Sequence, residues 1–158
     1  MKEAKTNAMR ALERAKIAYT PHEYDASEGV DGVHAAQALG VDPSCVFKTL
    51  VTHVRSGGHC VFVIPVAREL DLKKAARAAG EKSVEMLHVK DLLPTTGYVR
   101  GGCSPVGMKK AFPTFVDEGA LLHERIFVSA GRIGQQVELA PRDLAALTGA
   151  RFADLLAP

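Results

Sequence analysis

The apolar positions of this chain recur in short blocks, and their spacing predicts the elements of a mixed fold. Two apolar runs, at residues 46–51 and 60–66, predict buried strands, and the Ser56-Gly57-Gly58 segment between them predicts a hairpin turn. Helical spacing, capping residues and closing glycines predict helices at residues 6–16, 33–39, 71–80, 84–93 and 141–149. Further strands are expected at residues 19–24, 114–116, 125–129 and 135–139, the first at a sheet edge because of Pro21.

These elements predict an α+β fold with a single domain over residues 1–158. The sheet is expected to be mixed and largely antiparallel, or closed into part of a barrel, with helices on its flanks. The sequence contains no internal repeat, low-complexity tract or linker that would divide it.

One charged residue, Lys48, interrupts the first buried strand. Because side chains alternate along a strand, Lys48 shares a face with Val46 and Leu50, and Thr49 faces the other way. A lysine is rarely buried without a partner, so we expect Lys48 to reach an anion, a carbonyl group or a cleft. The alternative is an edge-strand lysine whose ammonium group extends into water.

Composition narrows the classes of function. The net charge is only +2 and there is no tryptophan, which argues against binding duplex DNA mainly through phosphates and against a broad platform for stacking bases. Three cysteines without CxxC spacing and six scattered histidines predict neither a disulfide framework nor a metal site. With no apolar run long enough to span a bilayer and no signal peptide, we expect a cytoplasmic protein that needs no cofactor.

Two glycine-containing segments are candidates for a binding site. In Gly101-Gly102-Cys103-Ser104-Pro105-Val106-Gly107, adjacent glycines allow close approach of the backbone to a ligand, and exposed amides can hold a carbonyl or phosphate oxygen. In Val128-Ser129-Ala130-Gly131, a strand ends in a hydroxyl residue before a glycine turn. Ordinary turns are the alternative interpretation of both segments.

Several segments occur together in the order and spacing of one family: Val46-Phe47-Lys48-Thr49-Leu50, Pro65-Val66, Leu70-Asp71-Leu72-Lys73-Lys74, Thr96-Gly97-Tyr98, the segment that begins with Gly101, and Val128-Ser129. On these residues the chain resembles the YbaK/EbsC family of free-standing aminoacyl-tRNA editing proteins. That family is similar to the editing domain inserted in bacterial prolyl-tRNA synthetases. The resemblance covers nearly the whole chain and is greatest to the Cys-tRNA(Pro) deacylase branch.

The resemblance implies a trans-editing enzyme that releases mischarged cysteine from the 3′ end of tRNA(Pro), with prolyl-tRNA synthetase as a partner. In that branch the thiol of the bound cysteine attacks its own ester carbonyl, so the enzyme needs only to position and polarise the ester. The implied catalytic groups are Lys48 and the amides of Gly101 and Gly102. The implied substrate-binding residues are Tyr24, Thr49, Ser104, Pro105, Ser129, Gly131 and Gln136.

Some residues depart from the pattern of the family or leave alternatives open. Gln136 stands where cysteine-specific members usually carry an acid, and Ala130 stands where they carry a second glycine, so the preferred amino acid is not fixed. Cys103 is expected to be a small apolar filler, because the family generally has an aliphatic residue at this position and the sequence around Cys103 lacks a nucleophile signature. Three rival functions are a deacylase for Ala-tRNA(Pro) or other small aminoacyl-tRNAs, a non-catalytic module that binds a nucleotide or the tRNA 3′ end, and a Schiff-base enzyme with Lys48 as nucleophile.

Overall fold

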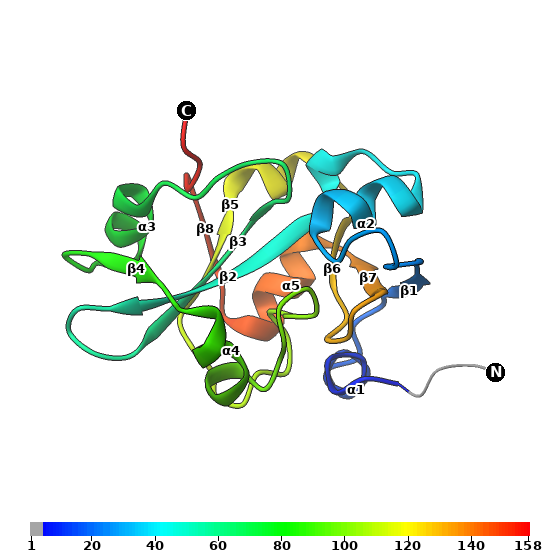
Figure 1. Ribbon diagram of the computed structural model, residues 1–158, viewed down its shortest axis with the longest axis horizontal. Helices are drawn as coiled ribbons and strands as arrows, with labels where there is room; N and C mark the ends of the chain where they lie inside the picture. The colour runs from blue at the N-terminus through cyan, green and yellow to red at the C-terminus, as the bar shows by residue number, and fades with distance from the viewer. Residues whose placement is uncertain (1–4) are drawn as a thin grey trace.

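Two β-sheets lie side by side in the computed structural model, which describes residues 5–158 (Figure 1). An isolated parallel bridge between Val46 and Phe127 links them at one edge. The sheets do not close on one another, so the open α+β arrangement is confirmed and the partly closed barrel is wrong. Among residues 5–158, no helix has the length and apolar character needed to cross a lipid bilayer.

The larger sheet is built around the predicted hairpin of β2 (Phe47–Val54) and β3 (His59–Pro65). Its strand order is β4-β2-β3-β5-β8, with β4 (Val84–Met86) antiparallel to β2. The strands β5 (Thr114–Asp117) and β8 (Arg151–Ala153) continue the sheet in parallel beyond β3. The hairpin is therefore central, which explains why both of its strands are so apolar.

The smaller sheet has the order β1-β7-β6 and is entirely antiparallel. It consists of β1 (Thr20–Glu23), β7 (Gln135–Leu139) and β6 (Ile126–Ser129). The proline-containing strand β1 lies at an edge, as predicted from Pro21. The register places Ser129 opposite Gln136 at the end of the β6–β7 pair.

Most of the helices begin and end at the residues that the sequence predicts. Asp31 caps α2 (Gly32–Leu39) and Asp71 caps α3 (Leu72–Ala79), each through its carboxylate, and a left-handed glycine closes each helix. Thr6 caps α1 (Asn7–Arg14), and Pro141 opens α5 (Pro141–Thr148). Two 3₁₀ turns, η1 (Pro43–Cys45) and η2 (Glu118–Leu122), complete the described helices.

The predicted helix at residues 84–93 is wrong at both ends. Residues Val84–Met86 form β4 because they pair with the outer edge of β2, from Val54 to Thr52. The helix that follows, α4 (Val89–Thr96), includes Pro94, which was expected to stop it. In a helix this short, the missing N–H of proline removes only one hydrogen bond near the C-terminal end. The three-residue strand β8 was not predicted either.

The core lies on both faces of the β2–β3 hairpin. Phe47 and Val51 belong to a buried cluster that includes Val128 and Val137 of the smaller sheet. Leu50 packs on the opposite face, against a cluster built with α3. The predicted alternation along β2 is therefore confirmed, and burial of each such apolar side chain contributes about 1.5–3 kcal/mol. This packing fixes the position of β2 relative to β6 and β7.

Candidate active site

A pocket of about 290 Å³ lies along the outer edge of β2, away from β3. The strand β4 pairs only with Thr52, His53 and Val54, so the 47–50 stretch of β2 has no strand partner on this side within residues 5–158. Segments far apart in the sequence meet here, namely β2, the loop before α2, the loop after α4, and the facing ends of β6 and β7. The lining residues are Tyr24, Val30, Asp31, Gly32, Phe47, Lys48, Thr49, Leu50, Arg100, Gly101, Cys103, Ser129 and Gln136.

Lys48 is a half-buried cation at this pocket. Across residues 5–158, its ammonium group has no hydrogen-bond or ion-pair partner. Its neighbour on the same face, Leu50, packs in the apolar cluster against α3. An ammonium group without a partner in such a place is available to an anion or to a polarised carbonyl oxygen.

Two buried side-chain atoms in the pocket residues have no hydrogen-bond partner among residues 5–158. They are Oγ1 of Thr49 and Oε1 of Gln136. The residue Gln136 as a whole is only 5% exposed. Buried polar atoms are almost always paired, so two orphan acceptors on one pocket indicate a ligand that donates hydrogen bonds. Thr49 lines the pocket together with Lys48 although their side chains alternate, because the pocket runs along the edge of the strand and borders both faces.

The glycine-rich loop contributes one of its two predicted amides to the pocket. Gly101 lines the pocket with a φ of +88°, and a Cβ atom there would lie 2.9 Å from Cβ of Val30. Among the described residues, its N–H has no acceptor. The N–H of Gly102 donates to the carbonyl oxygen of Val99 at 3.0 Å, and Gly102 does not line the pocket. Gly101 is therefore the available donor of the pair.

Two other predicted site residues, Ser104 and Gly131, do not line the pocket. Ser104 is fully buried, and its Oγ accepts a hydrogen bond from the N–H of Val106 at 3.2 Å. Gly131 has a φ of +96° and lies against the ring of Tyr98, where a Cβ atom would be 2.8 Å from Cε1. The N–H of Gly131 donates to Oγ of Ser129, which does line the pocket. Ser104 and Gly131 thus shape the turns that present Gly101 and Ser129.

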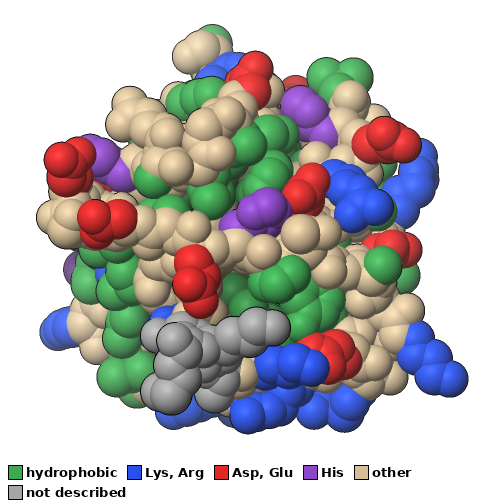
Figure 2. Space-filling view, turned by 90° about the vertical axis from the view of Figure 1, so that its right-hand side faces the viewer, with side chains coloured by type: hydrophobic (Ala, Val, Ile, Leu, Met, Phe, Trp, Pro, Cys, Tyr) green, Lys and Arg blue, Asp and Glu red, His purple; other side chains and the backbone are tan. Residues whose placement is uncertain are grey.

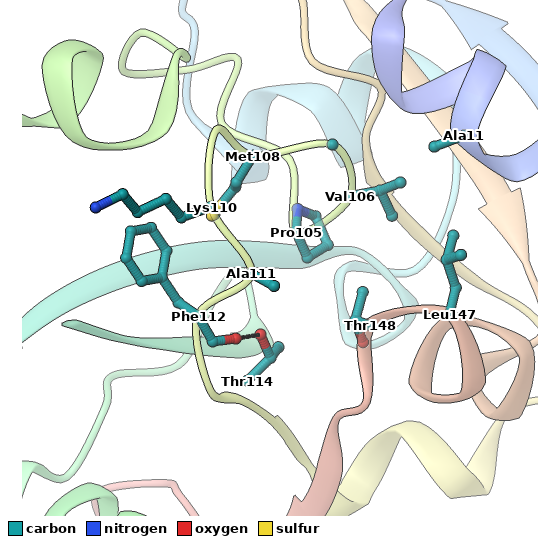
Figure 3. A pocket seen from close by; sticks show the side chains of 11 residues that line it. Ala11, Pro105, Val106, Met108, Lys110, Ala111, Phe112, Thr114, Leu147 and Thr148 are labelled. Atoms are coloured by element: carbon teal, nitrogen blue, oxygen red, sulfur yellow. Dashed lines mark hydrogen bonds between the residues drawn. The ribbon is translucent and has the colours of Figure 1, made fainter. Parts of the chain in front are cut away.

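Pro105 lines a different hollow, of about 190 Å³, shown in Figure 3. This hollow lies between the 105–112 loop and the helices α1 and α5, which contribute Ala11 and Leu147. Its wall includes Phe112, whose carbonyl oxygen accepts a hydrogen bond from Oγ1 of Thr114 at 2.9 Å. The lining mixes apolar side chains with Lys110, Thr114 and Thr148, and Pro105 is absent from the pocket that holds Lys48.

Sequence reasoning missed two charged residues of the pocket, Asp31 and Arg100. The Asp31 carboxylate accepts hydrogen bonds from the backbone N–H and the ring Nδ1 of His34, each at 2.9 Å. These hydrogen bonds hold the pKa of Asp31 below its usual value. The available signals were an acid at a helix N-cap and an arginine directly before the double glycine.

Cys103 also lines the pocket, but burial raises the pKa of its thiol to about 12. The thiolate is the nucleophilic form of cysteine, so this thiol is inert near neutral pH. Within residues 5–158, His, Cys, Asp and Glu side chains form no group of three or more that could hold a metal ion. The charged chemistry of the pocket therefore consists of Lys48, Arg100 and Asp31.

Comparison with known proteins gives consistent matches. The family model of the aminoacyl-tRNA editing domain matches residues 27–147. EbsC of Enterococcus faecalis (strain ATCC 700802 / V583), which has the provisional name Cys-tRNA(Pro)/Cys-tRNA(Cys) deacylase, is 51% identical over 152 residues, covering 96% of this chain and 93% of EbsC. A proline–tRNA ligase of Shouchella clausii (strain KSM-K16) is 32% identical over 100 residues, which are 63% of this chain and 17% of the ligase.

A solved structure of another protein has the same fold as this chain. It is described as a provisional trans-editing enzyme for prolyl tRNA synthetase and superimposes with a TM-score of 0.84 at 28% sequence identity. The superposition covers 99% of this chain and 100% of the other. The YbaK-like fold expected from the sequence is thereby confirmed.

Proposed function

Because the chain belongs to the aminoacyl-tRNA editing domain family, we propose that it is a trans-editing deacylase that releases mischarged cysteine from tRNA(Pro). The observation that carries the proposal is that Lys48 and Gly101, from distant parts of the chain, line one pocket together with Ser129 and Gln136. The match to EbsC along 96% of the chain supports residues 1–158 as one editing domain.

The pocket offers two donors to an ester carbonyl. As the ester is attacked, negative charge develops on its carbonyl oxygen, and fixed donors aimed at that oxygen stabilise the transition state. Lys48 supplies a positive charge, and Gly101 supplies a backbone N–H that has no acceptor among residues 5–158. Arg100, exposed beside Gly101, takes a phosphate oxygen of the tRNA 3′ end.

The nucleophile is supplied by the substrate. The sulfur of the cysteinyl ester attacks its own carbonyl carbon, a C–S bond forms, and the C–O bond to the terminal ribose breaks. The thiol proton passes to the ribose oxygen, and the product is a cyclic thioester that water then opens to cysteine. This intramolecular attack benefits from a high effective molarity, so no enzyme nucleophile is needed. The raised pKa of the Cys103 thiol is consistent with a reaction in which the enzyme supplies no nucleophile.

We further propose that prolyl-tRNA synthetase is a partner. The net charge is only +2, and on the face shown in Figure 2 basic side chains lie along the lower edge and on the right-hand side, interspersed with acidic ones. A protein with so little positive charge holds tRNA weakly by itself. A synthetase that has just charged tRNA(Pro) would deliver the aminoacylated end at high local concentration.

The direct test is deacylation of Cys-tRNA(Pro), Ala-tRNA(Pro) and Cys-tRNA(Cys) side by side, with and without prolyl-tRNA synthetase. We expect release of cysteine from Cys-tRNA(Pro), no release of alanine, which has no thiol, and faster release of cysteine when the synthetase is present. Release of alanine at an equal rate would favour a deacylase for small amino acids that uses water directly. Binding of all three tRNAs without release would favour a non-catalytic module.

A further inference from the structure

The substrate of the proposed deacylase carries an α-ammonium group, to which the mechanism above assigns no binding residue. Every aminoacyl ester has an α-ammonium group, which presents a positive charge and up to three N–H donors. In this pocket that charge would lie near two cations, Lys48 and Arg100. Without an opposing anion, binding of the ammonium group would be electrostatically unfavourable.

Among the described residues that line the pocket, Asp31 is the one with a carboxylate. Gln136 and Thr49 each add a neutral oxygen that is buried and has no partner among the described residues. One carboxylate and two orphan acceptors match the charge and the three donors of an ammonium group. From this match we infer that Asp31 is the counter-ion of the substrate α-ammonium, with Thr49 Oγ1 and Gln136 Oε1 as its two neutral acceptors.

The loop holds Asp31 in a fixed position before any substrate binds. Its carboxylate is anchored to the backbone and ring of His34, with distances of 2.9 Å. The His34 ring in turn lies directly against Gly29, where a Cβ atom would be 2.5 Å from Nδ1. Gly32 is even closer to Val66, where an added Cβ atom would lie 2.1 Å from Cγ1. A carboxylate held in this way loses little conformational entropy when an ammonium group arrives.

This inference rests on the proposed function, and it makes a prediction about selectivity. An enzyme that recognises the α-ammonium prefers Cys-tRNA(Pro) to N-acetyl-Cys-tRNA(Pro), in which acetylation removes the charge. Replacing Asp31 with Asn removes the anion and keeps a good helix N-cap, so α2 stays intact. Asp31→Ser also places a neutral N-cap residue at this position. An effect shared by both variants therefore cannot come from a folding defect specific to Asn.

The test compares kcat and KM for the two substrates in the wild type, in Asp31→Asn and in Asp31→Ser. We expect both variants to raise KM for Cys-tRNA(Pro) on the order of tenfold, with kcat nearly unchanged, and to treat the two substrates alike. A matched control is Asp42→Asn, since Asp42 caps η1 through the N–H of Ser44 and lies outside the pocket. That control should keep the wild-type preference.

The possible results separate the two proposals. If the wild type shows no preference for the free amine, or if both Asp31 variants keep its preference, the role given to Asp31 is wrong while the deacylase stands. If the wild type releases cysteine from neither substrate, the deacylase itself is wrong, and the role given to Asp31 is overturned with it.

Discussion

The backbone N–H of Gly102 donates a hydrogen bond of 3.0 Å to the carbonyl oxygen of Val99. This bond closes the turn that begins the glycine-rich loop, and it commits one of the two adjacent amides to the fold. Gly101, whose N–H has no acceptor within residues 5–158, is the residue of the pair that lines the pocket. Of the two adjacent glycines, Gly102 therefore uses its amide to stabilise the turn, and the amide of Gly101 has no acceptor among the described residues.

Replacing Gly101 with Ala should lower both stability and deacylation. Its φ of +88° strains any residue with a Cβ atom by about 1–2 kcal/mol, and that atom would press on Val30. Gly57 is a matched control, because its φ is +104° and a Cβ atom there meets nothing within 4 Å. Gly57→Ala should lower stability in urea unfolding and leave kcat/KM unchanged. Equal activity of the Gly101→Ala variant and the wild type would contradict the role given to the Gly101 amide.

Replacing Cys103 with Ala should leave deacylation of Cys-tRNA(Pro) within about twofold of wild type. Burial raises the pKa of the Cys103 thiol to about 12, so the thiol is protonated at neutral pH and is a poor nucleophile. Single-turnover kinetics at about pH 7.5 measure the effect directly. A loss of more than about tenfold would make Cys103 a participant in the chemistry and would remove the need for a nucleophile from the substrate.

Stability should fall in alkaline solution, partly through Tyr98. Burial raises the pKa of Tyr98 from 10.0 to about 12, so the folded state holds the phenolic proton more tightly than the unfolded state does. The resulting stability is fully present below about pH 10 and is lost as the pH rises towards about 12. Urea unfolding at about pH 8 and about pH 11 should show a smaller pH effect in Tyr98→Phe than in the wild type.

The same variant should be less stable near neutral pH. The Tyr98 hydroxyl donates to the carbonyl oxygen of Val106 at 2.5 Å in a buried position, and its loss should cost about 1–2 kcal/mol. A Tyr98→Phe protein with wild-type stability near pH 8 and an unchanged alkaline transition would contradict the contributions given to the Tyr98–Val106 hydrogen bond and to the raised pKa of Tyr98.

Local sequence signals predicted the elements whose causes are local. The carboxylate cap of Asp71 and the left-handed Gly80 define α3, and the turn at Gly57 and Gly58 defines the central hairpin. β4 was missed because Val84–Met86 becomes a strand only by pairing with the edge of β2, a contact that no short window of sequence contains. The division of the strands into two sheets is likewise a property of their pairing.

The site could be predicted only in part, for a similar reason. Lys48 stood out because a cation in a buried strand needs an explanation, and Gln136 stood out only through the family resemblance. The signal at Asp31, an acid at a helix N-cap, did not point to the pocket, because capping alone explains such an acid. Its presence in the pocket follows from the packing of the loop against Gly101 and Val66, which becomes visible only in three dimensions.

The central claim is that the Lys48 ammonium polarises the ester carbonyl. The measurement that tests it most directly is single-turnover deacylation of Cys-tRNA(Pro) by the wild type, by Lys48→Met and by Lys73→Met, an exposed lysine on α3 outside the pocket. We predict a loss of about a hundredfold for Lys48→Met at unchanged thermal stability, and no loss for Lys73→Met. A Lys48→Met protein that releases cysteine as fast as the wild type would contradict the account.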